Sequence, residues 1–367
     1  MNPLQELKKY GQSVWLDYIR RDILQDGTLK ERIKADNVRG VTTNPTIFQK
    51  GISGGTYYDD QIKKIIADSP SIDIPDLYEE LIIKDVEDAC EILAPVYDET
   101  SGTDGFVSLE VNPHHAENIE ETVGEAVRLW NRVNCENLMI KVPATPEGMP
   151  AIGKLIAEGL NINVTLIFSL GHYNSAANAY IRGLEQAPDP CKIASVASFF
   201  VSRIDTAVDD ALTGIGTPEA YDLRGKAAIA YAKIIYQRFK NIFFKAEFES
   251  HRKIGCSYQR PLWASTSAKN PDYSDVRYAE SLIGPNTVNT MPPATLEAFK
   301  DHGRVEETIE KNLDEAKKIL KKIENLGIDI VKITGRLQEE GVQKFVDSYD
   351  DLLDTLAEKV RVIKKSA

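Results

Sequence analysis

Short runs of strand-forming residues, separated by helical segments, recur eight times along the chain and constrain its fold more than any other feature. The runs are rich in Val, Ile, Leu, Thr and aromatic residues, and each has the length of a buried strand. They are SVWLDYI (13–19), VRGVTTNP (38–45), GFVSLEVNP (105–113), NLMIKVPAT (137–145), INVTLIFS (162–169), KIASVASFF (192–200), RPLWAST (260–266) and NTVNTMP (286–292). Such alternation is typical of a parallel (β/α)8 barrel, so we expect an α/β fold of the TIM-barrel type.

The segments between these runs have the spacing of amphipathic helices. Segment 117–134 places five apolar residues on one helical face, namely Ile119, Val123, Ala126, Val127 and Trp130. We also predict helices over 150–160, 171–187 and 217–242. An open, doubly wound sheet is the alternative arrangement, but no GxGxxG turn follows any of the runs.

Two parts of the chain exceed the needs of a simple barrel. The interval between Asn44 and Phe106 is too long for one connector, so we expect two or more additional helices there. Beyond residue 293 the chain reads as entirely helical, and its last stretch has apolar residues at helical spacing, namely Phe345, Tyr349, Leu352, Leu356 and Val360. We predict one domain, 1–367, in which 293–367 is a helical C-terminal extension packed on the barrel. Phe345 or Tyr349 could alternatively belong to a lid.

Polar residues interrupt the runs at positions that should point into the barrel. Alternate residues of a barrel strand face the interior and the surrounding helices. Thr165, for example, lies between Val164 and Leu166, and these apolar neighbours are expected to face the helices. The inward set is Asp17, Asn44, Glu110, Lys141, Asn163, Thr165, Ser198 and Ser265. Most of these residues lie near the carboxyl end of a strand, where barrel enzymes build their active sites.

Lys141 is the most unusual residue of this set, because it stands within the apolar run LMIKVPAT. Burial removes the water that favours the ammonium form, so part of the amine is expected to be neutral and nucleophilic. The alternative is a lysine whose ammonium group reaches water or pairs with a carboxylate. The position at a strand end and the nearby carboxylates favour covalent catalysis by Lys141.

Charge and composition argue against several classes of partner. The chain has 56 acidic and 44 basic residues, and its net charge of -12 opposes binding to nucleic acid. No apolar run reaches the about 18 residues that cross a bilayer, and the first residues lack the apolar core of a signal peptide. We therefore expect a cytoplasmic protein without a membrane partner. The four cysteines and five histidines show no metal-binding spacing, so we expect no metal.

Eight strings between residues 15 and 292 resemble the motifs of transaldolases, in the order found in that family. They are WLDYIRR, GVTTNPTIF, VSLEVNP, MIKVPAT, NVTLIFS, SFFVSRID, LWAST and TVNTMP. The chain is similar to the longer bacterial-type branch of this family, whose (β/α)8 barrel is related to the other Schiff-base, class I aldolases. The resemblance implies transfer of a dihydroxyacetone unit from sedoheptulose 7-phosphate or fructose 6-phosphate to an aldose phosphate. It also implies a place in the non-oxidative pentose phosphate pathway and no metal or organic cofactor.

The resemblance and the residue types together suggest catalytic roles. Lys141 would attack the ketose carbonyl, and Asp17 would take the proton of the C4 hydroxyl. The alternative for Asp17 is the N-cap of a helix over 19–24. Glu110 and Thr165 could hold a water that relays protons to Lys141, whereas the alternative for Glu110 is a direct ion pair with the lysine.

The same resemblance suggests how the substrate is bound. The residues suited to sugar hydroxyls are Asn44, Asn163, Ser198 and Ser265, although any of them could instead cap local backbone. Arg203 matches the family's phosphate-binding arginine, and its alternative is a salt bridge with Asp205 or Asp209. Many transaldolases have a second arginine where this chain has Ser267, so we expect Lys269 to substitute for it.

Three functions are compatible with the sequence. The first is a transaldolase, and the second is a related Schiff-base lyase that releases free dihydroxyacetone or cleaves another sugar phosphate. The third is a non-catalytic barrel that binds sugar phosphates, which would tolerate loss of Lys141, Asp17 or Glu110; the chain retains all three. Either a monomer or a homodimer fits the sequence.

Overall fold

The computed structural model describes residues 2–366; Met1 and Ala367, at the ends of the predicted domain and its extension, lie outside this part. Eight parallel strands form a closed barrel in the order β1 to β8, and β1 pairs with β8 to close it. The strands are β1 Gln12–Leu16, β2 Val38–Thr42, β3 Phe106–Glu110, β4 Leu138–Pro143, β5 Ile162–Ile167, β6 Ser195–Phe200, β7 Gln259–Ala264 and β8 Thr287–Met291. The predicted (β/α)8 barrel is therefore confirmed.

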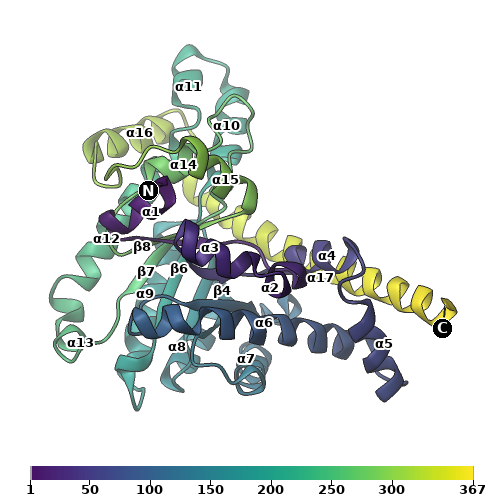
Figure 1. Cartoon of the computed structure of the whole chain (residues 1–367). Helices are drawn as coiled ribbons and strands as arrows, with labels where there is room; N and C mark the ends of the chain where they lie inside the picture. Colours follow the sequence, from purple (N-terminus) through teal and green to yellow (C-terminus); the bar gives the residue numbers. More distant parts are fainter. Residues whose placement is uncertain (1, 367) are drawn as a thin grey trace.

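Helices surround the barrel and also extend beyond it (Figure 1). Within residues 2–366 the α-helices are α1 Pro3–Glu6, α2 Arg21–Gln25, α3 Thr28–Asp36, α4 Pro45–Ser53, α5 Asp59–Asp68, α6 Ile74–Glu99, α7 Ile119–Val133, α8 Gly148–Ala157, α9 Leu170–Leu184, α10 Ser202–Ile215, α11 Pro218–Leu223, α12 Ala227–Phe243, α13 Glu249–Lys253, α14 Arg277–Ser281, α15 Pro293–His302, α16 Leu313–Asn325 and α17 Ile330–Ser366. The long interval before β3 holds α4, α5 and α6, as the sequence predicted.

Two helical predictions were too simple. The predicted helix 217–242 is divided into α11 and α12, because Gly225 takes a left-handed conformation with φ 68° and donates its N–H to Asp209 at 2.7 Å. The extension is also not entirely helical: residues 303–312 and 326–329 separate α15, α16 and α17. Gly327, with φ 86°, makes the second of these turns.

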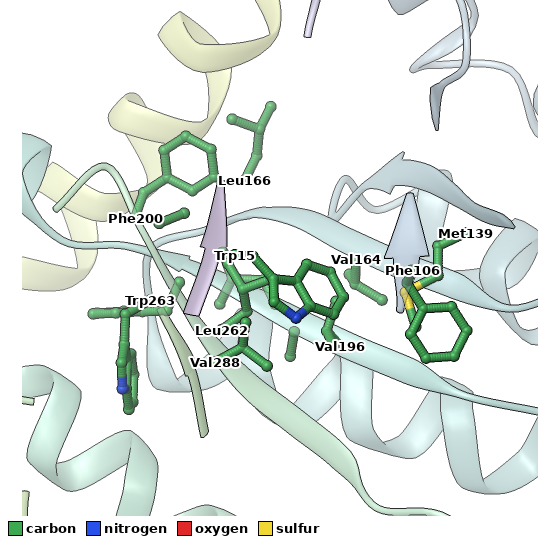
Figure 2. Packing of buried hydrophobic residues seen from close by; sticks show 14 of the residues in the cluster. Trp15, Phe106, Met139, Val164, Leu166, Val196, Phe200, Leu262, Trp263 and Val288 are labelled. Carbon is green, nitrogen blue, oxygen red and sulfur yellow. The ribbon is translucent and has the colours of Figure 1, made fainter. Parts of the chain in front are cut away.

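Large side chains fill the middle of the barrel. A Cβ on Gly40 would lie 2.6 Å from the Trp15 ring, so only glycine leaves room for the indole there. Figure 2 shows Trp15 among Val196, Leu262 and Val288. This packing fills the interior below the carboxyl ends of the strands, and the polar inward residues lie above it.

The last helix, α17, crosses the mouth of the barrel and packs beside α4 (Figure 1). Near its start, the Gln338 side chain donates hydrogen bonds to the carbonyl oxygens of Ala144 and Leu166, at 2.8 and 3.1 Å. Ala144 directly follows β4, and Leu166 is the next-to-last residue of β5. These hydrogen bonds therefore hold the helix against the strand ends that carry the candidate site. The predicted packing of a C-terminal helix on the barrel is confirmed.

The two-residue alternation of β5 breaks at its end. Leu166 has φ 57°, in the left-handed region that few non-glycine residues adopt, and the pairing of β5 with β6 shifts register between Val164 and Ile167. A Cβ on Gly341 of α17 would lie 3.0 Å from the Leu166 side chain. Leu166 therefore turns toward the helix above the mouth, and the expectation that it continues the outward row was wrong.

Candidate active site

A cavity of about 570 Å³ opens at the carboxyl ends of the strands, and we call it the front cavity. All the predicted site residues except Glu110 line it: Asp17, Asn44, Lys141, Asn163, Thr165, Ser198, Arg203, Ser265 and Lys269. Asp17, Asn44 and Ser265 follow the last residues of β1, β2 and β7, so the strands end slightly earlier than predicted. The barrel thus brings together residues that lie far apart in the sequence.

Lys141 lies in β4 and is held between its neighbours. Across the adjacent strands its register partners are Glu110 and Asn163. Its amine, in a side chain only 7% exposed, donates to Glu110 Oε2 and to the Thr43 carbonyl oxygen, each at 3.0 Å. The Phe345 ring of α17 lies 5.2 Å from Nζ. The structure therefore forms the direct lysine–carboxylate pair that the sequence left as an alternative.

Asp17 lies on the opposite side of the same cavity. Its carboxylate accepts a hydrogen bond of 2.7 Å from Thr42, whose hydroxyl also contacts that of Thr290. Desolvation raises the pKa of Asp17, although Thr42 and the charges of Lys141 and Lys269 oppose the shift. The N-cap alternative was wrong, because α2 begins at Arg21 and has no side-chain cap.

Glu110, the partner of Lys141, also has a raised pKa. Burial raises its pKa and the charge of Asp17 adds to the shift, while Lys141 opposes it through its charge and its hydrogen bond. The Thr165 hydroxyl is fully buried, and its oxygen has no hydrogen-bond partner in the described part of the chain. A buried hydroxyl of this kind is a binding point for water or substrate.

Amide and hydroxyl groups line the wall between these carboxylates. Asn163 donates to Ser108 Oγ at 3.0 Å and accepts from Ser198 Oγ at 2.6 Å, so its orientation is fixed. Asn44 caps α4 by accepting from the Ile47 N–H at 3.1 Å. The capping alternative therefore holds for the Asn44 oxygen, although the residue also lines the front cavity.

Ser265 reaches the cavity through a strained turn. It has φ 55°, and its hydroxyl lies 2.9 Å from that of Ser202 at the start of α10. Non-glycine residues in the left-handed region are costly and cluster at functional sites. The turn carries the chain from β7 toward Ser267 and Lys269.

Three cations gather at one end of the front cavity. Arg203 and Lys269 line it together with Lys50 of α4, and Lys269 donates to Ser267 at 2.8 Å. Partial burial lowers the pKa of Lys269, and the charges of Arg203 and Lys50 lower it further, while Asp17 opposes the shift. Repulsion of this kind is relieved by a bound anion, and a phosphate is the natural candidate.

The salt-bridge alternative for Arg203 was wrong. The Asp205 carboxylate accepts from the Ala228 N–H at 2.7 Å and from Tyr278 at 2.9 Å. Asp209 accepts from the Gly225 N–H and from Tyr273. Arg203 Nη1 is buried and has no hydrogen-bond partner among residues 2–366.

Several residues of the site were not predicted from the sequence. Thr42 and Thr290 share the inward parity of Asp17 in neighbouring strands, so the alternation of β2 and β8 could have indicated them. Phe200 likewise has the parity of Ser198 in β6, whereas the Thr43 carbonyl and Lys50 carry no such signal. Within the described residues, no group of three His, Cys, Asp or Glu side chains is placed to hold a metal ion, and no helix combines the length and apolar character needed to cross a membrane.

Comparisons with known proteins agree with these motifs. A model of the family described as Transaldolase/Fructose-6-phosphate aldolase matches residues 14–356. The chain is 47% identical to the transaldolase of Parafrankia sp. (strain EAN1pec), over 98% of each chain. It is 44% identical to the transaldolase of Trichodesmium erythraeum and 45% identical to that of Thermobifida fusca, again over 98% of each chain. The chain therefore belongs to the transaldolase/fructose-6-phosphate aldolase family of enzymes.

Proposed function

We propose that the protein is a transaldolase of the non-oxidative pentose phosphate pathway, working in the cytoplasm. It transfers a dihydroxyacetone unit from fructose 6-phosphate or sedoheptulose 7-phosphate to an aldose phosphate, through a Schiff base on Lys141. One observation carries this proposal: a buried lysine amine 3.0 Å from a carboxylate shares a cavity with a second carboxylate and a cluster of cations.

The Glu110–Lys141 pair supports formation of the Schiff base. The ammonium group gives a proton to Glu110, whose raised pKa favours the transfer, and the neutral amine attacks C2 of the ketose. Glu110 then returns the proton to the carbinolamine hydroxyl. Water leaves, and the iminium keeps the positive charge that the lysine carried. Atoms and charge balance without any other donor.

Asp17 then promotes cleavage of the carbon–carbon bond. It accepts the proton of the C4 hydroxyl, the C3–C4 bond breaks, and its electron pair moves into the iminium to give an enamine on Lys141. The raised pKa makes Asp17 a stronger base than an ordinary aspartate. The shortened aldose phosphate departs, and the enamine remains on Lys141 in the front cavity, beside the Phe345 ring.

Transfer reverses these steps with a second aldose phosphate. The enamine carbon attacks the aldehyde, Asp17 returns its proton to the new hydroxyl, and water hydrolyses the iminium. Arg203 and Lys269 would hold the phosphate of donor and acceptor in turn, because one cation cluster serves both. The hydroxyls would be bound by Asn44, Asn163, Ser198 and Ser265.

Product analysis tests the proposal. With fructose 6-phosphate and erythrose 4-phosphate, the enzyme should make sedoheptulose 7-phosphate and glyceraldehyde 3-phosphate in equal amounts. Without an acceptor, product should stop after one equivalent per site. Continuous release of free dihydroxyacetone would instead identify a lyase, the second activity named in the family description. No product under either condition would support a binding protein.

A further inference from the structure

A second cavity, of about 460 Å³, lies behind the catalytic pair, and we call it the rear cavity. Glu110 lines the rear cavity and is absent from the lining of the front cavity, whereas Lys141 lines only the front one. Their hydrogen bond of 3.0 Å therefore joins groups that face different cavities. Asn44 lines both cavities, so they are adjacent.

Polar groups continue from Glu110 through the rear cavity. Tyr78 lines the rear cavity together with Glu110 and Glu125. Burial raises the pKa of its hydroxyl, and the charges of Tyr349, Glu110 and Glu125 raise it further. Glu125 lies 2.7 Å from His115 Nδ1 and accepts from the Asn112 N–H at 3.0 Å. His115 is 28% exposed, so the row leads from a buried acid toward solvent.

The chemistry requires a path for water at this place. Forming the Schiff base expels one water from C2, and hydrolysis later consumes one. At both moments the sugar phosphate fills the front cavity, and the Phe345 ring lies over the amine. A water needs two to four polar partners in a protein interior, and the acids, amide and hydroxyl behind Lys141 supply them.

We propose that the rear cavity carries the water of Schiff-base formation and hydrolysis between Glu110 and solvent. The inference rests on the proposed function. It assigns Tyr78, Glu125 and His115 as positioning residues for this water, since none of them lines the front cavity. Substrate and water then use separate routes to the same lysine.

Gly124 offers a way to obstruct this path without touching the front cavity. It lies in α7, is exposed, and lines the rear cavity. A Cβ there would meet no atom within 4 Å, so a larger side chain fits without a clash. Gly124→Leu should therefore obstruct the path, while Gly124→Ala is the matched control that shares the gain in helix propensity.

The readout is oxygen exchange at C2 of fructose 6-phosphate in H₂¹⁸O, corrected for exchange without enzyme. Each cycle of Schiff-base formation and hydrolysis replaces this oxygen. We expect Gly124→Leu to slow the exchange about tenfold, a barrier raised by about 1.4 kcal/mol. The control should exchange at the wild-type rate, and KM for the donor should be unchanged in both variants.

Two results would overturn the inference in different ways. Exchange at the wild-type rate in Gly124→Leu, with the fold intact by circular dichroism, would show that water uses the front cavity, and the proposed function would stand. A wild-type enzyme that neither exchanges the C2 oxygen nor forms an adduct on Lys141 would overturn the proposed function and the water path together.

Discussion

Arg203→Ala tests the cation cluster at the end of the front cavity. The guanidinium contributes a buried nitrogen without a partner among residues 2–366, beside Lys269 and Lys50. An anion bound at this end of the cavity would give this nitrogen a hydrogen-bond acceptor. Removing it should therefore weaken phosphate binding and leave the free protein about as stable as before.

The magnitude follows from the hydrogen bonds that the guanidinium would make to a phosphate. A hydrogen bond to a charged group contributes about 1.5 to 3 kcal/mol, so kcat/KM for fructose 6-phosphate should fall about ten- to a hundredfold. Inorganic phosphate at 100 times its Kd should stabilise the wild type by about 2.7 kcal/mol, and the variant much less at the same concentration. Arg361→Ala is the control for removal of a surface charge, because Arg361 is 71% exposed and pairs with Glu358.

The assay compares fructose 6-phosphate with unphosphorylated fructose. Wild type and Arg203→Ala should use fructose about equally poorly, since it has no phosphate to bind. The melting temperature with and without inorganic phosphate gives an independent measure of phosphate binding in both proteins. If Arg203→Ala lowers activity toward both sugars by the same factor, Arg203 supports the fold rather than the phosphate, and Lys269 becomes the leading phosphate ligand.

Three further predictions concern the chemistry of the site. Asp17→Asn should form the Schiff base but break the C3–C4 bond about 10²- to 10⁴-fold more slowly, whereas Glu110→Gln should slow formation of the Schiff base. Trapping experiments that show the same blocked step in both variants would refute these roles. The pKa of Asp17 is raised above 3.8, so kcat/KM should fall as the pH is lowered and Asp17 becomes protonated, and this fall should begin at a higher pH than for an aspartate with an ordinary pKa. An acid limb of the pH profile with a pKa at or below 3.8 would contradict this prediction. Exhaustive EDTA treatment should leave activity nearly unchanged, and inactivation that Zn²⁺ reverses would indicate a metal-dependent class.

The strand runs predicted the barrel and the position of Lys141 well, because both depend on local patterns. A polar residue between apolar neighbours in a short run reveals its face of the strand without knowledge of the fold. Parallel pairing then places Glu110 beside Lys141, but the register that does so arises from the closed barrel. The sequence could therefore suggest both residues and still leave their direct contact as an alternative.

Other parts of the site depend on how helices lie over the barrel. Lys50 comes from α4 and Phe345 from α17, and their helical periodicity indicates a buried face but not what that face covers. The bulge at Leu166 likewise depends on pairing with β6 and on the helix above it. Tertiary contacts decided these positions, which is why local patterns could not.

Trapping with borohydride tests whether Lys141 forms the Schiff base with the donor sugar. Fructose 6-phosphate and borohydride together should inactivate the enzyme and leave an adduct of dihydroxyacetone size on the peptide that contains residues 138–145, at Lys141. Either reagent alone should leave activity intact. An adduct on Lys50 or Lys269 instead, or inactivation without any adduct on Lys141, would show that Lys141 is not the nucleophile.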